Sequence, residues 1–586
     1  MSNEKRFLIT TADERTWKFD RPVVFLGEWC RGYNRKHVWQ DMDAIVVPPY
    51  GLGAAKDADY AEARTLEDML FPVLCNTLNQ HHGVQHNERF WQIVLGHWLR
   101  RYVDAMLNRV KTLEQCLQVH EISGYTAYAN NQYYLSTLDS YSAIWAFNDD
   151  RWNNQLTVRI LDLLGVKNIP IELIGGCSLS GFRFKVLSTN SSLKKRFIKC
   201  GSKLISKLTR LLVRNNDAFI VSSYLPKKEE IKLQLALGQC PQLWDSSKFE
   251  TSDKPDRRLR EELAKRLLSK SDNNLEYVIS VMMFELLPVC YLEGFLSLNK
   301  LVKQQPWPHS PRFIFTSNNF DTDEVFKLWT ATKVELGYKY FTGQHGNNYG
   351  THRYMYPAIE EATADKFITW GWTDGLPQHT PAFVFKLAGR KTKNYNPLGG
   401  LLLIELCLMH RIQTWDVTSE FTYYFNEQME FVSKLASAPR RQLTIRLRDI
   451  TWNQEARWCA FDSTIKIDAG DTNLSSLIAG SRLVVHSYDS TGILETLLQN
   501  IPTLAFWQND FDHLRESAKP YYQLLVDVGI VHLTAESVTQ KVNEVWDDVD
   551  GWWGGSEIQS ARRQFCERYA RTSENPAQKL KQILLM

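Results

Sequence analysis

The chain has 586 residues, of which 44% are hydrophobic and 23% charged, so it is long enough for two or three domains with their own cores. A formal net charge of only +3 argues against a polycation that coats nucleic acid. Ten cysteines without a CxxC spacing favour a reducing compartment over a disulfide framework or a zinc ribbon. No stretch is apolar enough for a signal peptide or a membrane span, and we expect a cytoplasmic protein.

Short apolar runs that end in polar or glycine-rich turns recur in the first two thirds of the chain. They are typical of parallel strands, and they cover residues 21–30, 141–150, 311–320, 337–346 and 364–372. Between about 66 and 164 the sequence also has the periodicity of long helices. We therefore predict an N-terminal Rossmann-like domain over 1–375, with a helical insertion at about 66–164.

A second alternating series begins near Leu401. "GGLLLIELCL", a helix through "TYYFNEQMEFVSKLASA", "RQLTIRLRD" and "TIKIDAG" precede the stretch "SRLVVHSYDSTGILETLLQNIPTLAFW". This β-α-β-β-α-β order predicts a second Rossmann-like domain over 376–545, followed by a helical tail over 546–586. The predicted fold class is α/β, with two doubly wound parallel-sheet domains and a ligand in the crevice between them.

The stretch that starts at Ser481 contains a strand, a small polar turn and an amphipathic helix. Backbone N–H groups in the first turn of a helix, together with the helix dipole, attract an anion, and two hydroxyl side chains stand at this turn. We expect a nucleotide phosphate there and ribose hydroxyls on the carboxylate one turn further on. An ordinary capped helix is the alternative. The candidate nucleotide-binding residues are His486, Ser487, Ser490, Thr491, Gly492 and Glu495.

The Ser/Thr-Gly-x-x-Glu turn followed by "NIPTLAFW" resembles the donor-binding element of GT-B glycosyltransferases and of related glycerophosphotransferases. Over most of the chain, "FLGEWC", "GQHGNNYGTHRYMYPAIEEATADKFITWGW" and the tail "WW…ARRQFCERYA" resemble a bacterial transferase family of surface-polysaccharide gene clusters. The resemblance implies a GT-B-like enzyme that transfers a sugar from a nucleotide-activated donor to a lipid-linked cell-surface glycan, in lipopolysaccharide or capsule biosynthesis. A CMP-sugar such as CMP-Kdo is the leading donor candidate.

Under this interpretation the C-terminal domain holds the nucleotide-sugar and the N-terminal domain holds the acceptor. The resemblance implies no cofactor, because the nucleotide-sugar is a substrate, and no metal, because a helix dipole and basic side chains neutralise the leaving phosphate. Where the family has a phosphate motif this chain departs from it with "IRLRDITW", which leaves the role of Arg446 and Arg448 open, and we include both as candidates for donor binding. His82, His86 and Glu88 lack the spacing of a metal site.

Four side chains are candidates for the chemistry. Glu28 follows a strand in "FLGEWC" and can deprotonate an acceptor hydroxyl, while Asp149 and Asp150 are expected at another strand end as base or nucleophile. His345 lies on a glycine-flanked turn that can approach a ligand closely. For each, a purely structural role is the alternative. The candidate acceptor-cleft residues beside the histidine are Gln344, Gly346 and Tyr349.

Residues 193–214 form the one strongly basic stretch, with no acidic residue and with an apolar stripe at helical spacing. As a helix it suits the anionic inner face of the cytoplasmic membrane, and sparse aromatic residues disfavour nucleic acid as a partner. A solvated helix packed on the core is the alternative. Two other functions also remain open: a polyol-phosphate transferase with the same helix terminus, and a non-catalytic protein that binds or assembles glycans.

Overall fold

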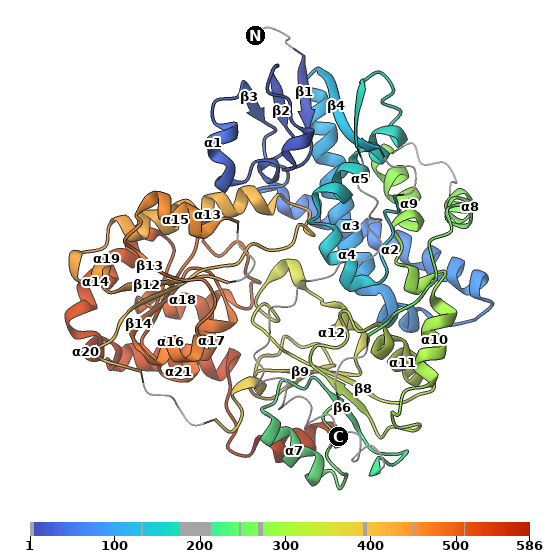
Figure 1. Cartoon of the computed structure of the whole chain (residues 1–586). Coiled ribbons are helices and arrows are strands. Elements are labelled where there is room, and N and C mark those ends of the chain that lie inside the picture. The colour runs from blue at the N-terminus through green and yellow to red at the C-terminus, as the bar shows by residue number, and fades with distance from the viewer. Residues whose placement is uncertain are drawn as a thin grey trace.

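The computed structural model describes residues 5–129, 133–175, 212–244, 248–267, 273–390, 395–448, 452–508 and 510–586. Figure 1 shows three parallel sheets, which we call the N-terminal, middle and C-terminal sheets. The doubly wound α/β fold class predicted from the sequence is confirmed.

The N-terminal sheet has five parallel strands in the order β3-β2-β1-β4-β5. The central strands β1 and β2 are apolar and almost fully buried, as expected for strands covered on both faces. The strand order reverses between β1 and β4, which creates a crevice at the carboxyl ends of these two strands. The strands are β1 Arg6–Ile9, β2 Val23–Phe25, β3 Ala44–Val46, β4 Ile122–Ala129 and β5 Ile171–Gly175.

The middle sheet has the order β10-β9-β8-β7-β6, so each strand pairs with its neighbours along the chain and the order never reverses. Its strands are β6 Phe219–Val221, β7 Ile314–Thr316, β8 Tyr340–Gly343, β9 Lys366–Thr369 and β10 His379–Pro381. The sequence predicts a single sheet within 1–375, whereas the structure has two there. Strands of three or four residues are too short for hydrophobic periodicity to reveal how many there are.

The C-terminal sheet has the order β13-β12-β11-β14-β15-β16, with a reversal between β11 and β14. The run of leucines in β11 is buried on both sides, which explains its continuous apolar character. The strands are β11 Gly400–Ile404, β12 Leu443–Arg446, β13 Lys466–Asp468, β14 Ser481–His486, β15 Thr503–Phe506 and β16 Val531–His532. The strands and helices named for this domain are present, but helices between β12 and β13 and between β13 and β14, together with β16, make the predicted β-α-β-β-α-β order incomplete.

Helices connect and cover these sheets (Figure 1). The first part of the chain contributes α1 Lys36–Trp39, α2 Ala55–His82, α3 Glu88–Val119, α4 Ser140–Ala146, α5 Asp150–Leu163, α7 Lys227–Ala236, α8 Arg257–Leu267, α9 Asn274–Leu286, α10 Phe295–Lys303, α11 Glu324–Glu335 and α12 Ile359–Thr363. The second part contributes α13 Val417–Ser433, α14 Ser437–Arg441, α15 Gln454–Phe461, α16 Leu474–Ala479, α17 Thr491–Leu498, α18 Lys519–Asp527, α19 Ala535–Val545, α20 Val549–Trp553, α21 Ser556–Tyr569 and α22 Pro576–Leu585.

Helices α2 and α3 form the predicted helical insertion, although β4 interrupts the range given for it. The Asn87 side chain caps α3 by accepting a hydrogen bond from the Phe90 amide at 2.9 Å. Gly83 ends α2 in a left-handed conformation, with φ at 65°. These local signals explain why both helices could be predicted from the sequence.

The segment 141–150, predicted as a strand, is a helix instead. Asp139 caps α4 by accepting a hydrogen bond from the Ser142 amide at 2.7 Å. Of the apolar residues that follow, Ala143 and Ala146 are buried, whereas Tyr141 on the same helix is exposed. The prediction was wrong because a short apolar run fits a buried helix as well as a buried strand.

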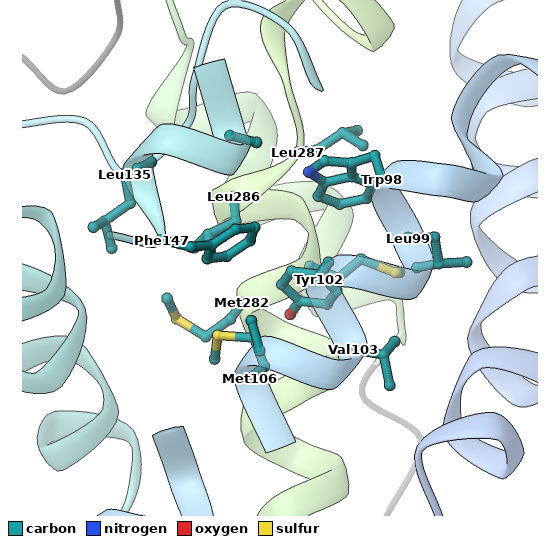
Figure 2. Close-up of a cluster of buried hydrophobic side chains, with 14 of the residues drawn as sticks. Trp98, Leu99, Tyr102, Val103, Met106, Leu135, Phe147, Met282, Leu286 and Leu287 are labelled. Atoms are coloured by element: carbon teal, nitrogen blue, oxygen red, sulfur yellow. The ribbon is translucent and has the colours of Figure 1, made fainter. Parts of the chain in front are cut away.

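One continuous hydrophobic core joins the N-terminal sheet, α3 and one face of the middle sheet. Figure 2 shows part of this core, where Trp98, Tyr102 and Met106 of α3 lie beside Met282 and Leu286 of α9. The Trp98 and Tyr102 rings are stacked, with centroids 5.1 Å apart. The two sheets before residue 382 are therefore packed around a shared helical layer.

The chain returns to the middle sheet at its end. Helix α21 packs against α17 and α18 beside the C-terminal sheet, and α22 packs against α7. Leu580 and Ile583 of α22 share a core with Phe313 and Phe341 of the middle sheet. The tail is helical, as predicted for 546–586, and it links the two sheets.

Candidate functional site

The loop after β8 and the first turn of α17 meet, although they are almost 150 residues apart in the sequence. The Asn347 amide donates a hydrogen bond to Thr491 Oγ1 at 2.9 Å. A side chain at Gly346 would bring its Cβ within 3.3 Å of the same oxygen. Two separately predicted motifs, the glycine-flanked histidine turn and the helix terminus, therefore form one site.

Helix α17 begins without a side-chain cap. Ser490 has the extended N-cap conformation, but its hydroxyl makes no capping bond to the helix, and the first turn contains no acidic residue. The Ser490 hydroxyl lies 3.4 Å from Nδ1 of His486 instead. A helix terminus with neither a cap nor an acidic side chain retains its ability to bind an anion.

His486 forms the floor under this helix turn. It is fully buried, and burial lowers its pKa to about 3, so that the ring is neutral near pH 7. A Cβ at residue 492 would lie 2.7 Å from the His486 ring, so only glycine fits there. The structure therefore gives Gly492 a packing role, which allows the helix turn to approach the histidine.

Asp489 ties the turn before α17 to its surroundings. Its carboxylate accepts hydrogen bonds from Asn347 Nδ2 at 2.7 Å and from the Tyr522 hydroxyl at 2.9 Å, and His513 Nε2 lies 3.2 Å away. Three groups from three segments thus fix this turn relative to the histidine loop. Asp489 and Asn347 were not among the site residues predicted from the sequence. Asp489 belongs to the motif "YDSTG" and Asn347 to "GQHGNNYG".

His345 itself is half-buried at the carboxyl end of β8, next to the aromatic rings of Tyr224, Phe320 and Tyr349. Burial lowers the pKa of His345, while Asp321 and the backbone of Ser317 oppose that shift. A histidine with a lowered pKa is neutral near pH 7, which is the form that accepts a proton.

The hydrogen bonds of Gln344 and Tyr349, predicted to line an acceptor cleft, stay within the protein. Gln344 Oε1 accepts hydrogen bonds at 2.8 Å from the Trp370 amide and from Trp372 Nε1. The Tyr349 hydroxyl donates to the Glu360 carboxylate and lies 3.2 Å from His345 Nδ1. Both side chains are buried, and they hold the loop that presents His345.

Behind Tyr349 lies a network of titratable side chains, of which Glu360 is buried and the others are half-buried. His97 Nε2 is 3.6 Å from Glu360, and its Nδ1 is 3.8 Å from Asp321, which pairs with Arg101 at 2.6 Å. Burial raises the pKa of Glu360 and lowers that of His97 to about 3. The network reaches from α3 to the histidine loop. Its members on α3 could not be predicted, because nothing in the sequence links them to residue 345.

Glu28 lies after β2, in a short 3-10 helix, and not after the first strand of the sheet. Its carboxylate is paired with Arg31 through two contacts, of 2.7 and 3.0 Å. The next residue, Trp29, has the Arg411 guanidinium of the C-terminal domain 3.9 Å from its ring centroid. Glu28 is thus beside the contact between the domains, but its hydrogen bonds go to Arg31 and not to the α17 turn.

Asp149 and Asp150 lie at the start of a helix, which corrects their predicted place at the end of a strand. Asp149 caps α5 by accepting a hydrogen bond from the Trp152 amide at 2.8 Å. Asp150 accepts one from the Ala12 amide, in the loop after β1, at 3.1 Å. Burial raises the pKa of Asp150, with Arg411 among the groups that oppose the shift. Asp149 therefore has a structural role, whereas Asp150 occupies the crevice of the N-terminal sheet.

The remaining donor candidates are dispersed. Arg446 is paired with Asp468 at the ends of β12 and β13, and Arg448 is exposed beyond β12. Glu495, expected near a ribose, is paired with Lys386 at 2.6 Å. These contacts show what each side chain does in the structure without a ligand, and nucleotide binding by them remains a prediction.

Ser487 connects two strands at the reversal of the C-terminal sheet. Its hydroxyl donates to the Ile404 carbonyl at 2.9 Å and lies 2.6 Å from the Tyr424 hydroxyl. Ser487 is buried, so it supports the crevice floor through these bonds.

No helix within the described ranges combines the length and the apolar character that a membrane span requires. The same part of the chain contains no group of three or more His, Cys, Asp or Glu side chains that could hold a metal ion. The basic stretch 193–214 falls outside the described residues up to position 211, so its predicted amphipathic helix stays a prediction.

Comparison with protein families gave one match. A model described as "LIC12162 family transferase" matches residues 6–584. The comparison with curated proteins gave no match.

Three solved structures illustrate the structural comparison. Spinosyn rhamnosyltransferase SpnG complexed with thymidine diphosphate is 10% identical, with a TM-score of 0.30, and the match covers 63% of this chain and 99% of that one. WaaG, a glycosyltransferase involved in lipopolysaccharide biosynthesis, is 12% identical, with a TM-score of 0.26 and coverage of 50% and 95%. UDP-GlcNAc 2-epimerase from Neisseria meningitidis bound to UDP-GlcNAc is 10% identical, with a TM-score of 0.29 and coverage of 60% and 98%. At these scores the likeness carries no argument about this chain.

Proposed function

Because the chain belongs to the LIC12162 family of transferases, we propose that it transfers a sugar from a nucleotide-activated donor to a cell-surface glycan. The fold in this proposal is GT-B-like, with the donor on the C-terminal sheet. The acceptor is a lipid-linked glycan of lipopolysaccharide or capsule biosynthesis, and a CMP-sugar such as CMP-Kdo is the leading donor.

One observation carries this proposal: the uncapped first turn of α17 lies against the loop that presents His345. The helix terminus offers backbone N–H groups and the positive end of a dipole to a phosphate. A neutral histidine next to it can accept a proton from a hydroxyl group. A site for the leaving phosphate beside a candidate base is what transfer of a sugar to a hydroxyl requires.

In the proposed reaction, the oxygen of the acceptor hydroxyl attacks the anomeric carbon of the donor sugar. The bond from that carbon to the phosphate oxygen breaks, and the electron pair leaves with the nucleotide. The α17 terminus, with the hydroxyl groups of Ser490 and Thr491, stabilises the negative charge of the leaving phosphate. The acceptor proton passes to His345, which the Tyr349 hydroxyl holds at Nδ1. The proposal includes neither a metal nor a cofactor.

His345 replaces Glu28 as the first candidate base because the loop that carries it contacts Thr491, whereas Glu28 is bound to Arg31. Asp150 remains a candidate on the side of the N-terminal sheet, where burial raises the pKa of its carboxyl group. Asp149 is the weakest candidate, since its carboxylate caps α5.

We also propose that residues 193–214 bring the enzyme to the anionic surface of the cytoplasmic membrane, where a lipid-linked acceptor is found. Basic residues near such a surface each contribute about 1 kcal/mol of attraction, which salt screens. Reversing the charges of Lys194, Lys195 and Arg196 should release the protein from anionic liposomes in a flotation assay. Flotation that is insensitive to lipid charge would contradict the membrane role.

The proposal is tested with a thermal-shift panel of CMP, UDP, GDP and TDP, with the corresponding nucleotide-sugars. A ligand at 100 times its Kd stabilises the folded protein by about 2.7 kcal/mol, which gives a measurable shift. The nucleotide that stabilises the protein identifies the donor class. If incubation with CDP-glycerol releases CMP and incorporates glycerol phosphate, the enzyme is a polyol-phosphate transferase. If no nucleotide and no nucleotide-sugar shifts the melting temperature, the proposed function is wrong.

A further inference from the structure

A cavity of about 160 Å³ opens at the carboxyl edge of the C-terminal sheet, where the strand order reverses between β11 and β14. Its walls come from the loop after β11, from α13 and from the residues that follow β14 and β15. Ligands of doubly wound sheets bind in this kind of crevice. Tyr488 lines the cavity and precedes the first residue of α17 by three positions, so the cavity adjoins the proposed phosphate site.

Part of the polar lining already has its partners within the protein. The Leu406 amide donates to the Tyr424 hydroxyl at 2.8 Å, this hydroxyl lies 2.6 Å from Ser487 Oγ, and Ser487 donates to the Ile404 carbonyl. This chain of hydrogen bonds leads from the loop to the sheet. It fixes the shape of the cavity and leaves these groups little capacity to bind a ligand.

One oxygen of the lining has no such partner. Gln428 is 1% exposed, and its Oε1 atom accepts no hydrogen bond within the described residues. The amide nitrogen of Gln428 donates to the Tyr424 carbonyl one turn back in α13, at 3.3 Å. Buried acceptors without partners are rare in native proteins and cost free energy, unless a ligand or water supplies a donor.

We propose that this cavity binds the sugar of the nucleotide-sugar donor, one of whose hydroxyl groups donates a hydrogen bond to Gln428. This inference rests on the proposed function. The transferred sugar is bonded directly to the phosphate, whereas a ribose separates the base from it, so the pocket next to the phosphate site suits the sugar. The free oxygen of Gln428 is an acceptor, which matches a hydroxyl donor, and the rings of Phe421, Tyr488 and Trp507 supply apolar walls.

The experiment measures binding of matched pairs of ligands by calorimetry. The pairs are CMP and CMP-N-acetylneuraminate, UDP and UDP-glucose, and GDP and GDP-mannose. Gln428→Leu removes the free acceptor, and we expect it to weaken binding of the nucleotide-sugar that the wild type prefers by roughly 5- to 10-fold. Binding of the free nucleotide should not change. Gln428→Met, which keeps the length of the side chain, repeats the measurement in case leucine disturbs the fold.

Asn426→Leu is the matched control, because Asn426 is an exposed amide on the same helix and should leave both affinities unchanged. Ser490→Ala with Thr491→Ala should weaken both ligands of a pair, because it acts on the phosphate. If both Gln428 variants bind the nucleotide-sugar as the wild type does, the sugar assignment is wrong. Equal loss of both ligands would also overturn it and assign the cavity to the nucleotide. A wild type that binds no ligand of the six overturns the proposed function, and this inference with it.

Discussion

The N-terminal and C-terminal sheets reverse their strand order at corresponding places, yet the two crevices are lined differently. In the N-terminal sheet, Asp150 accepts from the Ala12 amide, and Asn154 donates to the Thr10 hydroxyl at 3.0 Å and to the Thr126 carbonyl at 2.8 Å. The corresponding crevice of the C-terminal sheet has a cavity whose lining includes an unpartnered acceptor, Oε1 of Gln428.

The helices near these crevices also differ in the caps and charges at their N-termini. Asp149 caps α5, and Asp150 adds a second carboxylate in its first turn, so negative charge already occupies that helix terminus. Helix α17 has a serine at the N-cap position, with no capping bond and no acidic residue in its first turn. Since an anion is repelled by the first arrangement and attracted by the second, the comparison supports our proposal that the C-terminal sheet holds the nucleotide.

The largest loss of activity is expected for His345→Gln. This variant tests whether the reaction takes place where the loop after β8 contacts α17. Loss of a general base should lower turnover of the preferred donor by about 10²- to 10⁴-fold and leave nucleotide affinity nearly unchanged. Nucleotide release in the presence of lipid-linked glycan measures this. Glu28→Gln and Asp150→Asn are the comparison variants, and we expect a smaller loss for each. Full activity of His345→Gln would remove it as the base.

The double substitution Ser490→Ala and Thr491→Ala tests the difference between the helix termini directly. Two lost charge-assisted hydrogen bonds should weaken nucleotide binding by about 1–3 kcal/mol. Calorimetry with the nucleotide that the panel identifies gives this value. A folded double variant that binds the nucleotide like the wild type would show that the α17 terminus is not the phosphate site.

The next prediction concerns how the stability of the folded protein depends on pH. The two crevices differ here too, because His486 lies under α17 as a neutral ring, whereas Asp150 lies at the start of α5 as a carboxyl group. The pKa of His486 is lowered to about 3, so unfolding binds a proton between that value and the ordinary value of about 6.5. The stabilising contribution of the neutral ring is complete above pH 6.5 and is lost as the pH falls below it. The raised pKa of Asp150 has the opposite effect on stability, because it favours the folded protein as the pH falls.

We therefore expect the melting temperature to fall between pH 7 and pH 5, and His486→Gln to reduce that fall. The slope for one such group is at most about 1.4 kcal/mol per pH unit. Scanning fluorimetry at both values measures the effect. An equal pH dependence in wild type and variant would mean that His486 does not control it.

The smallest effect is expected for Asp149→Ala. This variant changes the N-terminus of α5, as the substitutions of Ser490 and Thr491 change that of α17. Loss of an N-cap should destabilise the protein by about 0.5–2 kcal/mol without changing nucleotide affinity. Thermal unfolding and calorimetry on the same sample distinguish the two. Weaker nucleotide binding by this variant would place part of the donor site at the N-terminal sheet, against the comparison above.

Several features follow from the sequence alone, because the signals that produce them are local. The leucine run of β11, the apolar stripe of α17 and the strand that follows it are confirmed as elements, in the predicted order. Asn87 and Gly83 likewise bound the long helices through contacts within a few residues. The helix terminus before Gly492 and the turn around His345 could therefore be singled out without a structure.

The tertiary structure alone decided which of these features belong together. The contact between Asn347 and Thr491 joins segments 144 residues apart, and no periodicity encodes such a pairing. The same holds for Gln428, whose free oxygen is recognisable only once the cavity and the absence of a partner among the described residues are seen. Asp149 was misplaced because a short buried helix and a short buried strand have the same apolar pattern. Burial, pairing and long-range contact depend on the whole packed chain, and the local sequence specifies only the elements that enter it.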